Sequence, residues 1–301
     1  MGALEELQAA IAGVAGSAGP SIVGVGHRWR GGSGVVVGAG LVLTNAHNID
    51  GDEMPVIFDA DRQATGRVTG VDPDADLAVV AVDTTGATPV SWPAGGAETS
   101  LGSVVFGVAR PGGRLRVTIG TVSSTERSFR GPEGRRITGA VEHTAPLPPG
   151  SSGGAIVDTT GRFLGLNTNR IDEGFYLAIP ADEALRSRVD ALARGETPVR
   201  PRLGIAVAPS GVARRLRRSV GLPERDGLLV RGVEDGSVAA RAGIVEGDLI
   251  VEVAGRAVPD ADALQEILAS LQPGVPFEIR LLRGAEERVV TAQAGAASGE
   301  A

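Results

Sequence analysis

The sequence predicts a mainly β first domain followed by a smaller domain of mixed α and β structure. From residue 21 to about residue 179, short runs of Val, Leu, Ile and Thr alternate with clusters of Gly, Pro, Asp and Ser. Closely spaced strands with such turns are typical of a barrel or a sandwich. Glycine contributes 45 of the 301 residues, about twice its usual share of roughly 7%, and a chain with many tight turns needs that excess.

The elements of the first domain, residues 1–194, follow in order along the chain. Within its N-terminal segment, residues 1–20, a short helix is expected over residues 3–15. Strands are expected at Val35–Val37, Leu41–Thr44, Leu77–Val82, Val104–Phe106 and Ile156–Val157. Between Pro180 and Ala193 the apolar spacing becomes helical: Leu185, Val189 and Leu192 share one face, and Gly195 ends the segment.

Residues 195–201 are polar and contain two prolines, which predicts a linker. The second domain is expected over residues 202–294 and a disordered tail over residues 295–301. In that domain the sequence predicts two strands, a helix and a hairpin, at Gly227–Val230, Leu249–Val253, Asp260–Leu271 and Phe277–Leu282 with Arg288–Thr291.

Composition excludes several classes of function. The net charge of −7 argues against a nucleic-acid or anionic-membrane surface. The basic cluster Arg214–Arg218 is interpreted as a solvated helix face. The chain has no cysteine and only three histidines, none of them paired at the spacing of a zinc site, so we expect no cofactor and no metal. No window is apolar enough for a membrane span.

Residues 1–8 carry two glutamates and neither Lys nor Arg, so they lack the positive region of a secretory signal. As written, the chain is expected in the cytoplasm, or outside it if a leader has been removed.

One pentapeptide, Gly150-Ser151-Ser152-Gly153-Gly154, suggests covalent chemistry. A serine between glycines on a tight turn exposes its hydroxyl and lets a substrate approach the backbone. Two upstream residues supply a base and an acid: His47 follows a hydrophobic strand, and Asp76 immediately precedes another. Asp72 and Asp74, in the same loop as Asp76, are interpreted as turn residues.

The chain order His47, Asp76, Ser152 is the order of chymotrypsin-type enzymes. Order alone leaves His143 as an alternative base. Because His143 lies only nine residues before Ser152, it would need a sharp fold-back, and His47 is therefore favoured.

These blocks resemble the HtrA/DegP serine proteases. The resemblance rests on Thr44-Asn45-Ala46-His47, Asp76-Leu77-Ala78-Val79-Val80 and the Gly150–Gly154 pentapeptide. It extends to Gly165-Leu166-Asn167-Thr168 and to Phe175–Pro180, which is similar to the family's last barrel strand, and it covers about residues 21–293. It implies a chymotrypsin-like double β-barrel protease domain and a catalytic triad of Ser152, His47 and Asp76.

The resemblance also assigns the sites around the triad. Backbone N–H groups of Gly150 and Ser152 are expected to form the oxyanion hole. The specificity pocket is expected to include Leu147, Asn169 and Arg170. The family cuts after Val, Leu or Ala and has small or aliphatic residues at the last two positions. Arg170 is expected either to point to solvent or to admit a polar or acidic side chain.

The second domain resembles a PDZ domain. Arg202-Leu203-Gly204-Ile205 is similar to a carboxylate-binding loop, with support from Gly236–Ile244 and Glu246–Ile250. The helix from residue 260 carries Leu264, Ile267, Leu268 and Leu271 on one face. Part of that face is expected to pack on the domain's own sheet. The peptide-binding residues are then expected to be Leu203, Gly204, Ile205, Leu264, Ile267 and Leu268.

The resemblance implies a serine endopeptidase that cleaves unfolded or misfolded proteins in protein quality control, with peptide C-termini bound at the PDZ domain for delivery or activation. The alternative is a catalytically silent PDZ scaffold or a chaperone-like binder. Relatives form trimers through N-terminal segments rich in aromatic residues. The first 28 residues here have none, and a homo-oligomer, such as a trimer, is still expected.

Overall fold

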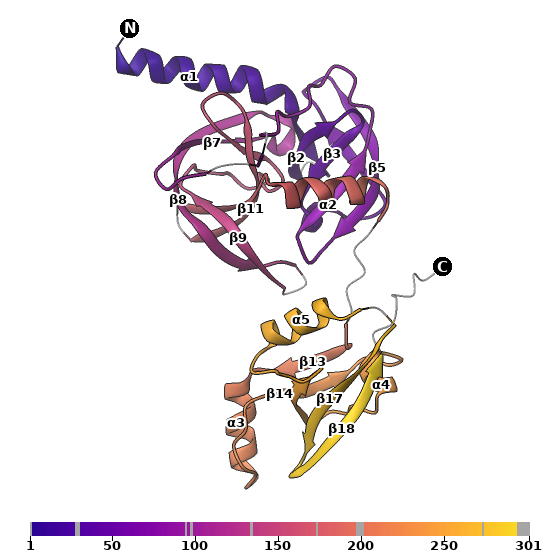
Figure 1. Cartoon of the computed structure of the whole chain (residues 1–301). Helices are drawn as coiled ribbons and strands as arrows, with labels where there is room; N and C mark the ends of the chain where they lie inside the picture. Colours follow the sequence, from indigo (N-terminus) through magenta and orange to yellow (C-terminus); the bar gives the residue numbers. More distant parts are fainter. Residues whose placement is uncertain are drawn as a thin grey trace. The chain divides into compact units, whose positions relative to one another are not determined.

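The computed structural model describes residues 2–27, 31–93, 95–96, 99–132, 135–172, 174–196, 202–272 and 274–293. The side chains of residues 3–4 and 169–172 lie outside this description. The chain divides into two compact units, Met1–Thr197 and Pro198–Ala301, and Figure 1 shows their elements. Most of the predicted linker and the whole predicted tail fall outside the described residues.

The first unit contains two closed barrels of six strands each. Within each barrel, neighbouring strands are antiparallel. The first barrel runs β1-β2-β3-β6-β5-β4. Its strands are β1 (Ile22–Val25), β2 (Gly32–Gly38), β3 (Leu41–Thr44), β4 (Glu53–Ile57), β5 (Gln63–Asp72) and β6 (Leu77–Ala81).

The second barrel runs β10-β11-β12-β9-β8-β7. Its strands are β7 (Val104–Ala109), β8 (Arg116–Arg130), β9 (Arg136–His143), β10 (Ala155–Val157), β11 (Phe163–Asp172) and β12 (Phe175–Pro180). The prediction of a mainly β first domain is therefore confirmed, with a double barrel as its form.

Alternate residues of the strands fill two different cores. In β2, β3 and β6, Val36, Val42 and Val80 point into the first barrel. Their neighbours Val35, Leu43 and Val79 belong to a second core shared with β7, β10 and β11 of the other barrel. Since successive side chains of a strand point to opposite faces, a run that is apolar at every position is buried on both. The uninterrupted valine runs thus join the two barrels.

Two helices complete this unit. Helix α1 (Ala3–Ala18) places Val14 and Ala18 in the shared core, and Ile11 packs against it. Helix α2 (Glu183–Ala193) buries Leu185, Val189 and Leu192, as the helical spacing predicts. Asp182 caps α2 by accepting a hydrogen bond from the Leu185 N–H at 2.8 Å.

The second unit has a sheet of order β13-β14-β15-β17-β18, with β16 paired to β15. The bounds are β13 (Ile205–Ala208), α3 (Ser210–Ser219), β14 (Leu228–Val233), α4 (Val238–Arg241), β15 (Asp248–Val253), β16 (Arg256–Ala257), α5 (Ala261–Ser270), β17 (Pro276–Arg283) and β18 (Glu286–Gln293). Among the described residues, strand β13 pairs only with β14. Its other edge is therefore open to an added strand.

Helix α3 corrects one interpretation. The basic cluster does lie on a helix, and Arg214 and Arg218 are solvated and pair with Asp226 and Glu224. Arg217, however, is only 5% exposed. Its guanidinium donates to the carbonyls of Pro223 and Gly284 at 2.9 and 3.0 Å, and burial lowers its pKa. Arg217 packs its stem against the domain because α3 covers the sheet face opposite α5.

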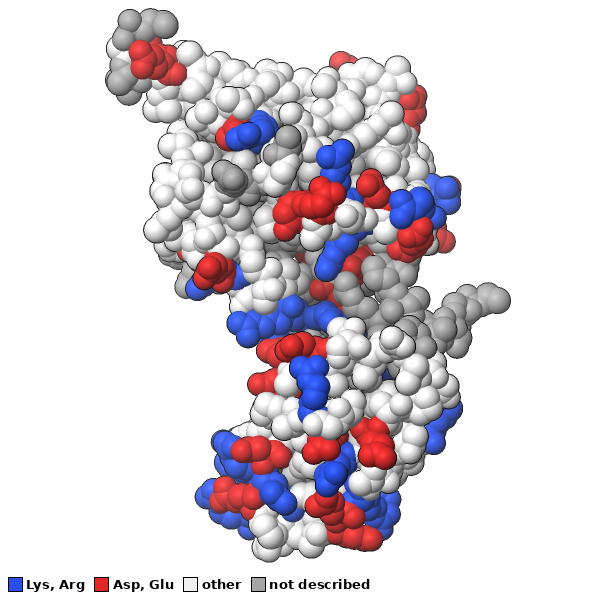
Figure 2. Space-filling view, viewed as in Figure 1, with Lys and Arg blue, Asp and Glu red and all other residues white. Residues whose placement is uncertain are grey.

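On the face shown in Figure 2, basic and acidic residues of the second unit alternate. Ion pairs in this unit join such opposite charges: Arg280 pairs with Glu252 and Glu287, and Arg288 pairs with Glu286. None of the helices in the described part of the chain is both long enough and apolar enough to cross a membrane.

Candidate active site

His47 lies in a short 3-10 turn, Ala46–Asn48, directly after β3. Its side chain is 33% exposed, so the imidazole is accessible. The Nδ1 atom lies 2.9 Å from one carboxylate oxygen of Asp76 and 3.0 Å from the other. The backbone N–H of His47 also donates to this carboxylate at 3.2 Å. Both barrel strands that lead to this contact, β3 and β6, are neighbours in the sheet, which brings His47 to Asp76.

Asp76 is the last residue of the turn between β5 and β6 and is fully buried. Its φ of +55° is one of two positive values among the described non-glycine residues. Aspartate tolerates this left-handed conformation better than most residues. The side-chain amide of Asn45 donates to the Asp76 carbonyl at 3.0 Å and holds the turn. Asp72 accepts from the Ala75 N–H at 3.1 Å, as a turn residue does.

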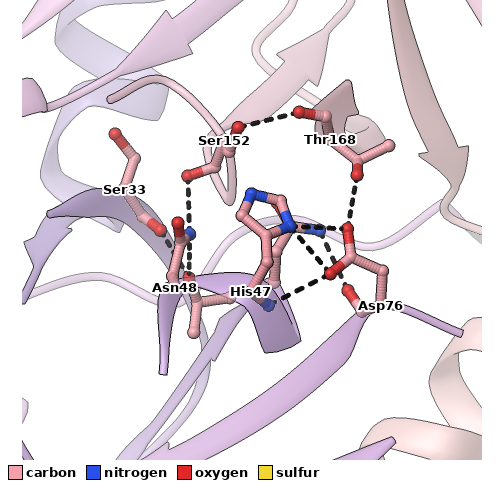
Figure 3. Close-up of polar contacts among 8 residues, drawn as sticks. Ser33, His47, Asn48, Asp76, Ser152 and Thr168 are labelled. Carbon is pink, nitrogen blue, oxygen red and sulfur yellow. Dashed lines mark hydrogen bonds and ion pairs between the residues drawn. The ribbon is translucent and has the colours of Figure 1, made fainter. Parts of the chain in front are cut away.

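Thr168 of β11 completes the environment of the acid. Its hydroxyl donates to the second Asp76 carboxylate oxygen at 2.6 Å. The buried carboxylate therefore accepts hydrogen bonds from the Thr168 hydroxyl and from the His47 ring, and this pairing places the ring proton on Nδ1. In Figure 3 the second ring nitrogen of His47 points away from Asp76, on the side of Ser152. This is the tautomer in which that nitrogen accepts a proton.

Ser152 lies on a loop of residues 147–154 between β9 and β10, which we call the nucleophile loop after the role that the sequence predicts for Ser152. Its hydroxyl donates to the Thr168 carbonyl at 2.8 Å, and no hydrogen bond joins these two described side chains, Ser152 and His47. Catalytic hydrogen bonds are often loose before a substrate is bound. In this structure the Ser152 hydroxyl is therefore bonded to a carbonyl of β11 and not to the imidazole.

Two glycines of the nucleophile loop have a conformation or a contact that excludes other residues. Gly150 and Gly153 both have a φ of +84°. A Cβ on Gly153 would lie 2.1 Å from the Ser33 carbonyl oxygen, far inside contact distance. The loop turns through hydrogen bonds from Ser151 N–H to Pro148 O at 3.2 Å and from Gly154 N–H to Ser151 O at 2.9 Å. In the described residues, no acceptor is bonded to the N–H of Gly150 or Ser152. Both donors are thus available to a ligand.

A pocket of about 150 Å³ opens beside Ser152. Leu147, Pro148, Pro149, Thr168 and Tyr176 contribute to its lining. Leu147 is the one expected pocket residue whose side chain is described there. Asn169 and Arg170 belong to β11 by their backbone, but their side chains lie outside the described residues. Tyr176 was not expected from the sequence, where Phe175–Pro180 indicated only a strand.

His143, the alternative base, lies at the end of β9 and is fully buried. Its Nε2 lies 3.0 Å from Asn167 Oδ1, and its ring stacks on Tyr176 with centroids 5.9 Å apart. Its Nδ1 has no partner in the described part of the chain. Burial lowers the pKa of His143 to about 4, partly offset by the hydrogen bond to Asn167. His143 thus contacts Asn167 and the pocket residue Tyr176, whereas the ring bonded to Asp76 is that of His47.

This pKa predicts a stability change with pH. Because the unfolded state binds a proton near pH 6.5 and the folded state near 4, the neutral histidine's contribution is complete above 6.5 and is lost as pH falls toward 4. The loss approaches about 3 kcal/mol. We expect His143→Gln to remove this part of the pH dependence, as measured by urea unfolding between pH 7.5 and 4.5. Identical pH profiles for both proteins would contradict it.

In the second unit, Leu203 and Gly204 meet the turn that precedes α4. The Leu203 carbonyl accepts from Ala239 N–H, and the Gly204 carbonyl from Glu234 N–H, each at 2.9 Å. Gly204 has a φ of +71°, and a Cβ there would lie 2.4 Å from Ser237 Cβ. Only glycine fits this loop.

The helix residues of the expected groove are largely buried in the domain core. Leu264, Ile267 and Leu268 are 6%, 1% and 5% exposed, whereas Ile205 of β13 is half-buried. These three residues are therefore the part of the helix face that packs on the domain's own sheet. The apolar surface that they leave to a ligand is small.

Several residues that hold the site were not singled out from the sequence. Thr168 was noted within a family block without a role, and Ser33, Asn48 and Tyr176 carried no signal. Their partners are distant in sequence, as in the case of Thr168 and Asp76, which are 92 positions apart.

Comparison with known proteins assigns both units. Residues 32–166 match the family of trypsin-like peptidase domains, and residues 229–283 match the PDZ domains. The fold and this site thus define a trypsin-like serine protease with a PDZ domain. The chain is 34% identical over 276 residues to a putative serine protease, HhoA, of Synechocystis sp., covering 87% of this chain and 70% of that protein. It is 29% identical to a probable periplasmic DegP-like serine endoprotease of Halomonas elongata, covering 88% of this chain and 56% of the relative.

Among solved structures, the HtrA-type protease AlgW with a decapeptide superposes with a TM-score of 0.72 at 25% identity, covering 96% of this chain and 99% of that one. A serine endoprotease from Yersinia pestis gives 0.70 at 26% identity, covering 96% and 98%. The chain belongs to the HtrA/DegP family of serine proteases.

Proposed function

We propose that this protein is an endopeptidase in which Ser152, His47 and Asp76 are the catalytic triad and which cleaves unfolded or misfolded proteins. The observation that carries the proposal is the buried Asp76 carboxylate, held between His47 Nδ1 and the Thr168 hydroxyl. It fixes the imidazole with its other nitrogen free to act as a base. A silent scaffold has no need of this arrangement.

The proposed reaction follows from these positions. Ser152 Oγ attacks the carbonyl carbon of the scissile bond while His47 Nε2 takes its proton. The carbonyl oxygen becomes an oxyanion that accepts hydrogen bonds from the Gly150 and Ser152 N–H groups. His47 then gives the proton to the leaving amine, and the acyl-enzyme forms. Water, deprotonated by His47, attacks the acyl carbon; the bond to Ser152 Oγ then breaks, His47 returns the proton to Oγ, and the acid is released.

The pocket beside Ser152 supports an apolar side chain before the scissile bond. Leu147, the two prolines and the Tyr176 ring line it, and such surfaces favour apolar ligands. We propose a small or medium aliphatic residue there, as the family prefers. The sites cut in an unstructured protein would show whether a polar or acidic residue is accepted instead.

The experiment that tests the proposal is degradation of casein by the purified chain, with a fluorophosphonate label for the reactive serine. We expect the wild type to cleave casein and to be labelled, and Ser152→Ala to do neither. Labelling without cleavage would indicate a site that awaits an activating ligand, in agreement with the bond of Ser152 to Thr168. A folded wild type that is neither cleaving nor labelled would favour the silent scaffold or chaperone-like binder.

We also propose that the PDZ domain binds peptide C-termini as a strand added to β13, with the carboxylate at the Leu203-Gly204-Ile205 loop. The open edge of β13 and the left-handed Gly204 support it. Leu264, Ile267 and Leu268 would shape the groove mainly from the core, and Ile205 would contact the ligand.

A peptide with a hydrophobic C-terminus should therefore bind the full-length Ser152→Ala protein at least about tenfold more weakly when its carboxylate is amidated, since charge-assisted hydrogen bonds are lost. Fluorescence anisotropy measures both peptides. Equal affinities would show that no carboxylate is recognised.

Compartment and assembly are further proposals. The name of the Halomonas relative describes a periplasmic protein, which favours the exported alternative over the cytoplasm. We propose a homo-oligomer, such as a trimer, in which α1 takes part, since Leu7 on this helix is 42% exposed. Light scattering that shows a monomer at micromolar concentration would refute the oligomer.

A further inference from the structure

We infer that Ser33 and Asn48 of the first barrel are positioning residues that hold the nucleophile loop of the second barrel in its reactive conformation. The inference rests on the proposed peptidase function and extends it to two residues outside the triad. Figure 3 shows both side chains on the side of Ser152 opposite Thr168.

Ser33 is fully buried at the start of β2 and contacts the loop twice. Its hydroxyl donates to the Gly150 carbonyl at 2.9 Å, and its backbone N–H donates to the Ser152 carbonyl at 2.8 Å. The hydroxyl also accepts from the Arg110 N–H at 2.9 Å. Since a serine hydroxyl has a single proton, the Arg110 bond leaves that proton directed at Gly150. The 117-residue separation between Ser33 and Gly150 shows that this contact links the two barrels.

Asn48, in the turn that carries His47, also binds the Ser152 carbonyl. Its amide donates to the Ser152 carbonyl and to the Thr44 hydroxyl, each at 3.0 Å. The Thr44 hydroxyl in turn donates to the Ser33 carbonyl at 2.7 Å. The base and the nucleophile are thus tied through one side chain, because His47 and Asn48 are adjacent in the 3-10 turn.

The packing leaves the nucleophile loop no room to move closer. A Cβ on Gly153 would lie 2.1 Å from Ser33 O and 2.5 Å from Thr44 Oγ1, and a Cβ on Gly32 would lie 2.2 Å from Asn48 Nδ2. The Gly153 backbone therefore rests on the Ser33 carbonyl, and glycine is required there, whereas Gly32 leaves room for the Asn48 side chain.

These bonds fix the peptide groups around the proposed oxyanion hole. The anchored carbonyls belong to the 150–151 and 152–153 peptide groups, so the 151–152 group, which carries the Ser152 N–H, is held between them. The 149–150 group, which carries the Gly150 N–H, adjoins the first. Gly150 is free of the restraint that a Cβ imposes, and the Ser33 hydroxyl supplies the restraint instead. Loss of the Ser33 hydroxyl would let the 149–150 peptide group turn its N–H away from the oxyanion.

The test compares Ser33→Ala, Asn48→Ala and a control, Thr84→Val, with the wild type. Ser33→Ala keeps the backbone bond to Ser152 and removes only the hydroxyl. Thr84 is 8% exposed, and its hydroxyl accepts from the Gly40 N–H at 2.8 Å, away from the loop. The control thus loses one buried hydroxyl bond of the first barrel, whereas Ser33→Ala loses two. The measurements are kcat and KM for a fluorogenic peptide, inhibition by the matching peptide aldehyde, and the unfolding midpoint.

We expect Ser33→Ala to lower kcat by about 10- to 100-fold with KM changed by less than about threefold, because the oxyanion exists only after attack. The aldehyde forms a tetrahedral adduct with Ser152, so its affinity should fall by the same factor as kcat. Thr84→Val should keep wild-type kinetics although its unfolding midpoint falls, by less than that of Ser33→Ala. If Ser33→Ala does not fold, Asn48→Ala, at a partly exposed position, decides by the same readouts.

Wild-type kcat in both Ser33→Ala and Asn48→Ala would overturn the inference, and so would a loss of kcat with unchanged aldehyde affinity. Either result leaves the peptidase function intact. A wild type that neither cleaves the peptide nor is labelled at Ser152 would overturn the proposed function, and the inference with it.

Discussion

Replacing Ser152 by alanine is expected to lower kcat by about 10⁴–10⁶. The variant loses the atom that attacks the scissile carbonyl in the proposed mechanism, and a water molecule in its place lacks a fixed position between His47 and the oxyanion donors. Folding should be unaffected, because the side chain contributes one hydrogen bond, to the Thr168 carbonyl, of about 1 kcal/mol. Cleavage of a fluorogenic peptide and tryptophan fluorescence measure the two quantities.

Ser151→Ala is the matched control. This neighbouring hydroxyl is buried and has no hydrogen-bond partner in the described residues. Its removal should therefore cost less than about tenfold in kcat, since no group is left unsatisfied. If Ser151→Ala were the inactive variant and Ser152→Ala retained activity, the assignment of the nucleophile would be wrong.

Replacing Asp76 by asparagine is expected to lower kcat by about 10⁴. An amide NH₂ beside His47 Nδ1 stabilises the wrong tautomer, in which the nitrogen facing Ser152 carries the proton and cannot accept another. Asparagine tolerates the φ of +55° as aspartate does. The loss should thus appear in kcat and not in the unfolding midpoint.

Asp72→Asn controls for the charge change in the same loop. Asp72 accepts from the Ala75 N–H through its side chain, as an asparagine also does, and its ion pair with Arg188 is long, at 3.6 Å. The variant should cleave at nearly the wild-type rate. Equal losses in Asp72→Asn and Asp76→Asn would mean that the net charge of the loop matters and the tautomer does not.

The sequence alone predicted three strands of the first barrel, β2, β3 and β6, and the helix between Pro180 and Ala193. Their signals are local: valine-rich runs between turn residues, and Leu185, Val189 and Leu192 at helical spacing. Helix α3 was only partly foreseen. Its arginines indicated a helix face, yet the burial of Arg217 depends on carbonyls of Pro223 and Gly284, the second 67 positions away.

The identity of the three proposed catalytic residues was also available from the sequence, because each lies in a short block with its own turn and strand. What holds them was not. Thr168 contacts the acid from 92 positions away. Ser33 and Asn48 contact the nucleophile loop from 117 and 104 positions away. No local spacing reports on such contacts.

By itself, then, the sequence determined the two-unit organisation of strands and helices, and named His47, Asp76 and Ser152 as candidates, since propensity, turn chemistry and chain order are local properties. Only the tertiary structure decided that the Thr168 hydroxyl holds the acid, that Ser152 rests against a carbonyl, and that Leu264, Ile267 and Leu268 are core residues. These outcomes depend on how closed barrels and a packed sheet bring distant backbone together, which hydrogen-bond satisfaction and close packing determine over the whole fold.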